Sequence, residues 1–518
     1  MRMIDFFDRG ARNAPSQPCM VSAGRSITYA QLRARSIRIA HALIADGFAA
    51  GAHGAVLSGN DPAAFEAILG LLRADGVWTM ANARASEDEN AYLLDLLDVD
   101  TLFLHTEVAE RIARFRRDCP KIRRYVTIDA PHAEADAFLG DWLARPNDAE
   151  VPRRRHGAPD ELAFLANTGG TTGRPRGVML TNLVWQSLVS SLVASMPMKA
   201  PPVNLVAAPM THAAGPLALA SMALSGTVVV LPRFEAGAVL EAIERHRVTY
   251  MFLPPTAIYM LLDHPEVRRR DLASLEYVSY AGAPMSAERL KEAIALFGPV
   301  MNASFGQTEA PMCVTAMPPH QHLNAAGELA HPGSCGQANL LSQVEIMDEE
   351  GRLLPPGERG EIVVRGPLVM AGYYRNPEAT AEVSRFGWHH TGDIGYRDAE
   401  GWFFIVDRKK DMIISGGFNV YPAEVEQALQ AHPAVQDCAV FGIPDDKWGE
   451  QVTAVVECRA GIAPPPPEEL IAFARARLGA VKTPKQLTYT EALPRSNAGK
   501  VLRAALRQPY WNQRERTI

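Results

Sequence analysis

Long hydrophobic runs are missing from this chain of 518 residues. No stretch of about 18 apolar residues occurs, so the sequence predicts no transmembrane helix. The longest apolar stretches, such as 217–222 and 227–231, suit buried strands or helices instead. The first residues carry charges and no long apolar core, so we expect no signal peptide there.

The chain also has few cysteines and no excess of positive charge. The six cysteines have no C-x-x-C spacing, which argues against a disulfide framework or a zinc site and favours reduced thiols in a cytoplasmic protein. The formal net charge of −6 argues against electrostatic binding of nucleic acid. No repeat of solenoid period and no Walker A pattern is present. The composition is that of a globular protein of two or more domains.

Short apolar runs alternate with amphipathic segments between about residues 50 and 310. Residues 54–57 are predicted to form a strand and residues 62–74 a helix, because apolar residues recur at helical spacing in the second segment. Further helices are predicted at 237–246, 256–262 and 286–297. Strands separated by helices imply an α/β fold with right-handed crossovers and largely parallel sheets.

The pattern changes twice towards the C-terminus. About residues 340–405 show period-two apolar spacing with Gly and Pro turns, which predicts a small antiparallel β unit. A third region follows, with helices predicted at 422–431 and 468–478 and strands near 439–441 and 453–458. We therefore expect a large domain at 1–407, with stacked, mostly parallel sheets and helices, and a small α+β domain at 408–518.

The strongest local signal is the loop TGGTTGRPRG, residues 168–177, which follows an apolar strand. Its glycines let the backbone turn tightly and point N–H groups at one centre, its threonines add hydroxyl donors, and its arginines add positive charge. This chemistry predicts a polyphosphate cradle, with an ordinary surface loop as the alternative. The residues with this predicted role are Thr168, Gly169, Gly170, Thr171, Thr172, Gly173, Arg174 and Arg176.

This loop resembles the TSGTTGxPKG signature of the adenylate-forming superfamily, which includes acyl-CoA synthetases, firefly-type luciferases and peptide-synthetase adenylation domains. Gly169 stands where serine is usual, and Arg176 where lysine is usual. Further motifs occur in the order of the family, and the resemblance spans residues 25–503. They are FGQTE at 305–309, WHHTGD at 388–393, DRKKD at 407–411, SGGFNVYP at 415–422 and PRSNAGK at 494–500.

The resemblance to acyl-CoA synthetases implies a site for ATP. It makes Lys500 the catalyst of adenylation and brings Thr308 against the acyl carboxylate or the α-phosphate. Glu309 is expected to help hold Mg²⁺, a cation that prefers oxygen ligands. Asp393 and Arg408 are expected to contact the ribose, whose hydroxyls an ionised carboxylate accepts well.

The resemblance also implies the surroundings of the adenine. The residues expected there are Gly282, Ala283, Pro284, Ala303, Ser304, Phe305 and Gly306. Ala303 stands where the family often has an amide or a carboxylate. Whether the neighbouring Asn302 replaces that contact is left open by the sequence.

A second half-reaction is implied as well. In relatives, the small C-terminal domain rotates about the position of Lys410, and the turn of Gly416 and Gly417 then approaches the active site. His212 matches a residue that gates the path of the thiol beside the acyl group. The expected acceptor is the thiol of coenzyme A.

Three functions compete. The first is a free-standing acid–CoA ligase, and the second loads a carrier protein's phosphopantetheine; the lack of a fused carrier domain favours the first. The third, a non-catalytic binding protein, is disfavoured because Lys500, Asp393, Arg408 and Glu309 are all present. Small or apolar residues at 213–215 and 310–313 predict an apolar acyl site without a cation, which favours a medium-chain aliphatic or aryl monocarboxylic acid. The sequence leaves open whether the protein forms a homodimer.

Overall fold

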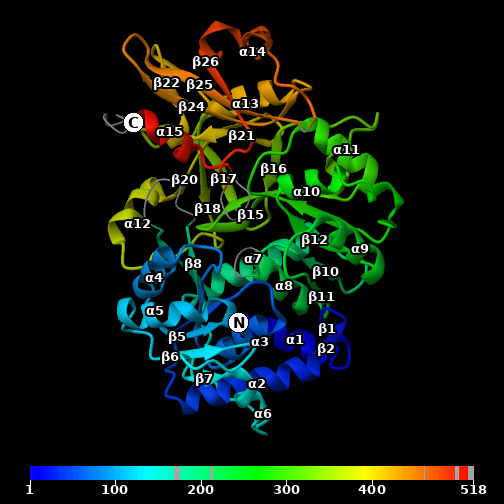
Figure 1. The fold of residues 1–518 in the computed structure, drawn as a ribbon, viewed down its shortest axis with the longest axis vertical. Helices are drawn as coiled ribbons and strands as arrows, with labels where there is room; N and C mark the ends of the chain where they lie inside the picture. The colour runs from blue at the N-terminus through cyan, green and yellow to red at the C-terminus, as the bar shows by residue number, and fades with distance from the viewer. Residues whose placement is uncertain (169–174, 211–213, 460, 496–500, 512–518) are drawn as a thin grey trace.

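The computed structural model describes residues 1–168, 175–210, 214–459, 461–495 and 501–511. In this part of the chain, three sheets of 13, 8 and 5 strands form the framework. Figure 1 shows the two larger sheets in the body of the molecule and the smallest at the end that carries the C-terminus, coloured orange to red. The mixed α/β architecture expected from the alternating pattern is confirmed.

The 8-stranded sheet is mostly parallel. Its six strands from β8 to β7 run parallel to their neighbours, whereas β9 and β19 are antiparallel. In spatial order the strands are β19 (Gly372–Tyr373), β9 (Gly177–Thr181), β8 (Leu162–Asn167), β4 (Val77–Met80), β3 (His53–Leu57), β5 (Val99–Leu104), β6 (Arg124–Thr127) and β7 (Ala137–Phe138). The strand predicted at 54–57 is β3.

The 13-stranded sheet has a parallel part and an antiparallel part. The run from β14 to β1 is parallel, as expected. In spatial order the strands are β17 (Gln343–Met347), β18 (Gly360–Arg365), β20 (His389–Arg397), β21 (Phe403–Arg408), β16 (Ser334–Ala338), β15 (Ala310–Met317), β14 (Met301–Gln307), β13 (Tyr277–Tyr280), β12 (Tyr250–Leu253), β10 (Val203–Val206), β11 (Thr227–Val230), β1 (Pro18–Ser22) and β2 (Arg25–Thr28).

Helices cover both faces of these sheets. One buried core joins side chains of the two sheets to the helices α1 (Met3–Asn13), α2 (Tyr29–Ala45), α3 (Pro62–Arg73), α7 (Asn182–Ser195) and α8 (Ala214–Ala223). All ten residues of α8 are buried, because this helix is apolar on every side. The outer faces are covered by α9 (Ala236–His246), α10 (Pro255–Leu262) and α11 (Ala287–Phe297) on the larger sheet, and by α4 (Glu87–Leu96) and α5 (Ile112–Asp118) on the smaller.

The expected antiparallel unit at 340–405 is part of a larger structure than the sequence indicated. Its strands β17, β18, β20 and β21 pair antiparallel, as predicted. They are continuous with the 13-stranded sheet, however, because β16 pairs with both β21 and β15. Long-range pairing of this kind leaves no trace in local periodicity. The helix α12 (Pro377–Val383) lies in the same region.

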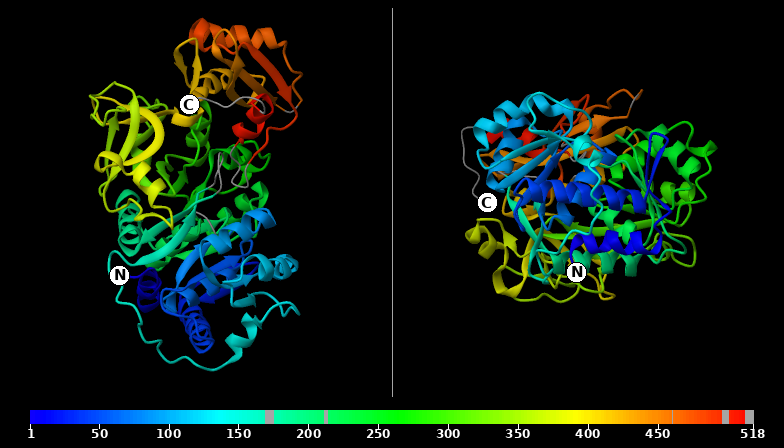
Figure 2. Two further views of the ribbon diagram at one scale, coloured as in Figure 1. Left: turned by 90° about the vertical axis from the view of Figure 1, so that its left-hand side faces the viewer. Right: turned by 90° about the horizontal axis from the view of Figure 1, so that it is seen from below.

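The C-terminal region has a sheet and a core of its own. Its strands, in spatial order, are β23 (Phe418–Val420), β22 (Ile413–Ser415), β25 (Gly449–Cys458) and β24 (Val435–Asp445), with β26 (Gln486–Thr490) paired to β25. The helices α13 (Pro422–Gln430) and α14 (Pro467–Lys482) bury their apolar faces on it, and α15 (Arg503–Trp511) packs beside β24. Both predicted helices and both predicted strands are confirmed. Figure 2 shows this region at one end of the molecule.

The predicted boundary near residue 407 falls at the end of β21, just before the 3₁₀ turn Lys409–Asp411 that joins β21 to β22. The division into domains at this point stays a prediction. All six cysteines lie in the described ranges and are free thiols. No helix among the described residues is long and apolar enough to cross a membrane.

Candidate functional site

Both ends of the predicted phosphate loop are held together. The strands β8 and β9 form an antiparallel pair in which Asn167 lies opposite Gly177. The backbone N–H of Thr168 donates to the carbonyl of Arg176 over 3.0 Å, and the N–H of Arg176 donates to Oγ1 of Thr168 over 3.1 Å. Residues 169–174, which carry the other predicted loop contacts, lie outside the described residues. The chain therefore enters and leaves this loop at one fixed point.

The Thr308–Glu309 dipeptide is the connection between β14 and β15. Glu309 is buried, with 8% of its surface exposed. Its backbone carbonyl accepts a hydrogen bond from the N–H of Met370 over 2.8 Å, and its side-chain Oε1 accepts one from the Tyr373 hydroxyl over 2.7 Å. Burial and the neighbouring Glu309 carboxylate raise the pKa of Tyr373, so this hydroxyl stays protonated and donates.

Tyr373 also lies beside the phosphate loop. The guanidinium carbon of Arg176 is 5.2 Å from the centre of the Tyr373 ring, within the range of a cation–π contact. The predicted metal ligand and the predicted loop thus meet through a tyrosine that the sequence did not single out. Tyr373 is 64 positions from Glu309 in the chain, so only the folded structure brings the two together.

The surroundings of Glu309 in the structure suit a divalent cation. Within the described residues, the hydrogen-bond partner of its side chain is a neutral hydroxyl, not a cation. A buried carboxylate is costly without a compensating positive charge. Mg²⁺ favours oxygen ligands next to phosphate, and a carboxylate supplies them. Glu309 would therefore hold such an ion, and the ion would offset charge on the phosphates.

The predicted adenine-binding residues lie at the ends of two parallel strands. Tyr280 of β13 pairs with Ala303 of β14, and Ala303 is buried. The following Gly282 has φ of +85°, a conformation that glycine adopts at little cost, and the segment 282–284 is exposed. These positions leave open backbone beside buried strand ends, as a planar base requires.

Asn302 does not stand in for the missing contact at Ala303. Its side-chain Nδ2 donates to Oγ of Ser279 over 3.0 Å, and the residue is buried. Successive side chains of a strand point to opposite faces, so Asn302 and Ala303 serve different sides of the sheet. This placement argues against Asn302 as the replacement for that contact.

Asp393 and Arg408 are brought into contact by strand register. They lie opposite each other on β20 and β21, and Nε of Arg408 is 2.8 Å from Oδ1 of Asp393. The carboxylate is almost fully buried, whereas the arginine side chain is one-third exposed. The Asp393 backbone is fixed by a hydrogen bond to Oγ1 of Thr391. An acceptor and a donor therefore stand side by side at one end of this hairpin.

Gly416 and Gly417 form the turn between β22 and β23. Their φ values are +60° and +80°, as in the two-residue turns that join antiparallel strands. The N–H of Gly416 donates to the carbonyl of Trp448 over 2.7 Å. A Cβ atom at Gly416 would lie 2.6 Å from the Trp448 ring, whereas one at Gly417 would meet open space. His212 and Lys500 lie outside the described residues.

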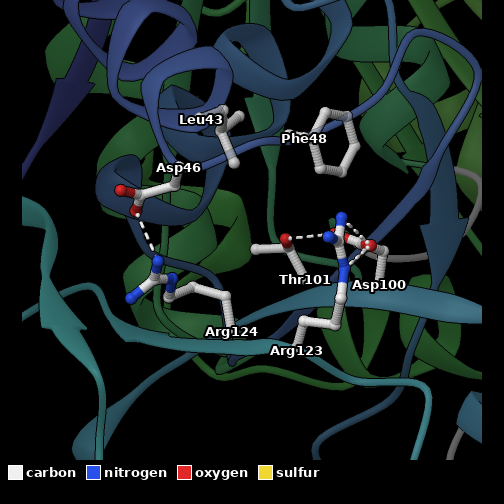
Figure 3. A pocket seen from close by; sticks show the side chains of 7 residues that line it. All are labelled: Leu43, Asp46, Phe48, Asp100, Thr101, Arg123 and Arg124. Carbon is white, nitrogen blue, oxygen red and sulfur yellow. Dashed lines mark hydrogen bonds and ion pairs between the residues drawn. The ribbon is translucent and has the colours of Figure 1, made fainter.

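One small cavity is too small to be the acyl site. It measures about 30 Å³ and lies near the ends of α2, β5 and β6, where Leu43 and Phe48 form its apolar wall (Figure 3). Arg124 pairs with Asp46 over 3.3 Å, and Nε of Arg123 donates to Asp100 over 2.6 Å. This volume holds about one or two water molecules. Because the charged residues around this cavity pair with one another, we regard the cavity as part of the packing of the fold and not as a binding site.

Comparison with known proteins agrees with these features. Residues 7–374 match the family model of the AMP-binding enzyme, and residues 424–500 match that of the AMP-binding enzyme C-terminal domain. A feruloyl-CoA synthase from an Amycolatopsis species is 37% identical over 506 residues, covering 97% of this chain and 98% of the relative. A fatty acid–acyl-carrier-protein ligase, ScoC, from Streptomyces coeruleorubidus is 32% identical over 513 residues, covering 98% and 96%.

A solved structure is similar over the whole chain. The amide bond synthetase McbA from Marinactinospora thermotolerans superposes with a TM-score of 0.89 at 33% identity, covering 98% of this chain and 99% of that one. The matched family model spans most of the chain and includes the loop, the Thr308–Glu309 turn and Tyr373. The chain belongs to the family of AMP-binding, adenylate-forming enzymes, as the resemblance in its motifs implied.

Proposed function

We propose that this protein is an ATP-dependent acid–CoA ligase that works through an acyl-adenylate. The observation that carries the proposal is the meeting of Glu309 with the end of the 168–177 loop, together with the Asp393–Arg408 pair. A buried carboxylate for the metal ion, a donor-rich loop for the phosphates and a paired acceptor and donor for the ribose suit a nucleoside triphosphate.

In the first half-reaction, a carboxylate oxygen of the acid attacks the α-phosphorus of ATP. The bond between the α-phosphorus and the bridging oxygen breaks, and pyrophosphate leaves. Negative charge grows on the α-phosphate, and Lys500 and the loop donors are the groups we assign to offset it. Thr308 is assigned to orient the acid or the α-phosphate. The protein forms no covalent bond to the substrate, so positioning dominates its contribution.

In the second half-reaction, the thiol of CoA attacks the carbonyl carbon of the acyl-adenylate. The thiol proton is lost, the thioester forms, and AMP leaves. We assign His212 to the path of the thiol and the Gly416–Gly417 turn to the closing of the site. A rotation of the C-terminal region about Lys410 would exchange Lys500 for this turn.

The acid is proposed to be a medium-chain aliphatic or aryl monocarboxylate. Ala310 and Cys313 are buried beside the Thr308–Glu309 turn, and Ala214 and Gly215 are buried at the start of α8. A Cβ atom at Gly215 would lie 2.1 Å from the Met210 carbonyl, so the chain there is tightly packed. None of these residues carries a positive charge that would hold a second carboxylate.

A panel of acids tests the substrate class. Pyrophosphate release should be at least tenfold faster with octanoate or an aryl acid than with malonate or succinate. Preference for a dicarboxylate would contradict the proposed acyl site.

The acceptor has one competing candidate, a carrier-protein phosphopantetheine, supported by the similarity to a carrier-protein ligase. Thioester and AMP formation with CoA, measured beside a holo carrier protein at the same concentration, separates the two. Product with the carrier protein alone would favour the competing function.

A further inference from the structure

The segment that follows β18 grips Glu309 at two points. The N–H of Met370 donates to the Glu309 backbone carbonyl, and the Tyr373 hydroxyl donates to Oε1 of the side chain. Backbone and carboxylate are thus fixed by residues only three positions apart. Within the described residues, Oε1 accepts from Tyr373 and no hydrogen bond reaches the second oxygen, Oε2.

Tyr373 is itself immobilised. Its side chain is buried, its backbone N–H donates to Oγ1 of Thr380 over 2.9 Å, and its strand β19 pairs with β9. In that pair Tyr373 lies opposite Val178, and the N–H of Ala371 donates to the carbonyl of Met179. The phenol therefore stands on a strand paired with β9, the strand that leaves the phosphate loop, and the Arg176 guanidinium lies over its ring.

We propose that Tyr373 is a positioning residue, which sets the orientation of the Glu309 carboxylate towards Mg²⁺ and links it to the phosphate loop through Arg176. The inference rests on the proposed role of Glu309 as the metal ligand. Hydrogen bonds from neighbouring groups are the usual means by which proteins orient carboxylates that bind metals. A tyrosine that only filled space would need its ring but not its hydroxyl.

The next residue in the chain offers a matched control. The Tyr374 hydroxyl donates to Oδ2 of Asp98 over 2.6 Å, so it also holds a carboxylate. Asp98 is further paired with Arg375, and the Tyr374 ring lies edge-on to His53 at 5.5 Å. Tyr373→Phe and Tyr374→Phe therefore remove the same kind of bond, one beside Glu309 and one remote from it. Both variants keep the ring.

The first readout is metal binding without catalysis. Mn²⁺ bound to the complex of protein and ATP is measured by electron paramagnetic resonance, with no acid present. Tyr373→Phe should weaken Mn²⁺ binding about tenfold, the lower end of the range for removing a group that orients a metal ligand. Tyr374→Phe should change it less than twofold. Equal Mn²⁺ affinities in the two variants would overturn the proposal.

The second readout is a double-mutant cycle with Glu309→Gln. If Tyr373 acts through the carboxylate, Tyr373→Phe should have little further effect on Mn²⁺ binding once Glu309 is replaced. Fully additive effects would overturn the proposal even if Tyr373→Phe lowered stability. The proposed function is tested separately, by acid-dependent pyrophosphate release of the unaltered protein, so its failure is distinguishable from a failure of this inference.

Discussion

At the scale of single residues, Asp393 shows how the site combines burial with pairing. Its carboxylate is 5% exposed and held by Arg408, and the backbone on either strand is fixed by the ladder. The resemblance in the motifs picked both residues, whereas their contact follows from the register of β20 and β21. We propose that a carboxylate placed in this way contacts a bound nucleotide in the ground state and the transition state alike.

Asp393→Ala should therefore raise KM for ATP more than it lowers kcat. The expected increase in KM is about 10- to 100-fold, the range for hydrogen bonds to a charged group. Asp398→Ala, in the turn of the same hairpin, is the control and should leave KM unchanged. A fall in kcat alone would contradict a simple role in nucleotide binding.

The buried side chain of His389 lowers the stability of the folded protein. It is 4% exposed, and neither ring nitrogen has a hydrogen-bond partner among the described residues. Burial lowers the pKa of His389 to about 4, with a further lowering from His390 that Glu361 opposes. The folded state thus binds this proton less readily than the unfolded state. The folded state therefore keeps its full stability above pH 6.5, the ordinary pKa of histidine, and loses stability as the pH falls towards 4.

His389→Leu should raise the thermal midpoint at pH 7 and flatten the loss of stability between pH 6.5 and 4. The gain at the acid end should be about 2–3 kcal/mol. Part of the acid sensitivity should remain, because burial also lowers the pKa of His322 to about 4. Thermal unfolding at several pH values checks this, with the exposed His320→Leu as control. An unchanged pH profile would contradict it.

At the scale of elements, the turn between β22 and β23 gives a paired test of two glycines. Both have positive φ, but only Gly416 lacks room for a Cβ atom, because of Trp448. Gly417→Ala should cost about 1–2 kcal/mol from backbone strain alone. Gly416→Ala should cost more, since the Trp448 ring must also move. Denaturant unfolding measures both, and equal losses would contradict the packing argument.

Local patterns predicted the elements well where packing is periodic. The helices α3, α9, α10, α11 and α13 match the predicted ranges within one or two residues, because apolar residues recur in each at helical spacing. The local pattern predicts no element in the first 49 residues, although they form α1, α2 and the β1–β2 hairpin at the sheet edge. The joining of β21 to β16 was missed because strand pairing across the chain is not a local property.

The candidate site shows the same division. The sequence supplied the loop chemistry and, through resemblance, the residues Glu309, Asp393 and Arg408. It gave no signal for Tyr373, which is one of two adjacent tyrosines and matters only through a partner far away in the chain. Motifs record chemistry that recurs, whereas positioning contacts emerge from the fold.

At the scale of the whole molecule, polar contacts join the C-terminal region to the rest. Asp407 at the end of β21 accepts from the N–H of Ala423 at the start of α13, and pairs with Arg503 of α15 over 3.3 Å. Arg359, just before β18, pairs with Glu424 of α13 over 3.1 Å. The Arg359–Glu424 pair is partly exposed and contributes little stability, whereas Asp407 is buried, so its contacts are the costly ones to break when the orientation changes.

The central claim is that two separable half-reactions share one site. Lys500→Ala should reduce adenylate formation by about 10²–10³, the scale for removing one donor that stabilises a developing oxyanion. Given a synthetic acyl-adenylate and CoA, the same variant should form thioester at close to the unaltered rate. Lys410→Pro should do the reverse, because proline fixes φ at the proposed hinge.

The most direct measurement is a pair of single-turnover assays, one for each half-reaction, on both variants. We expect Lys500→Ala to lose the first half-reaction and keep the second, and Lys410→Pro to keep the first and slow the second. Equal loss of both half-reactions in both variants would contradict it.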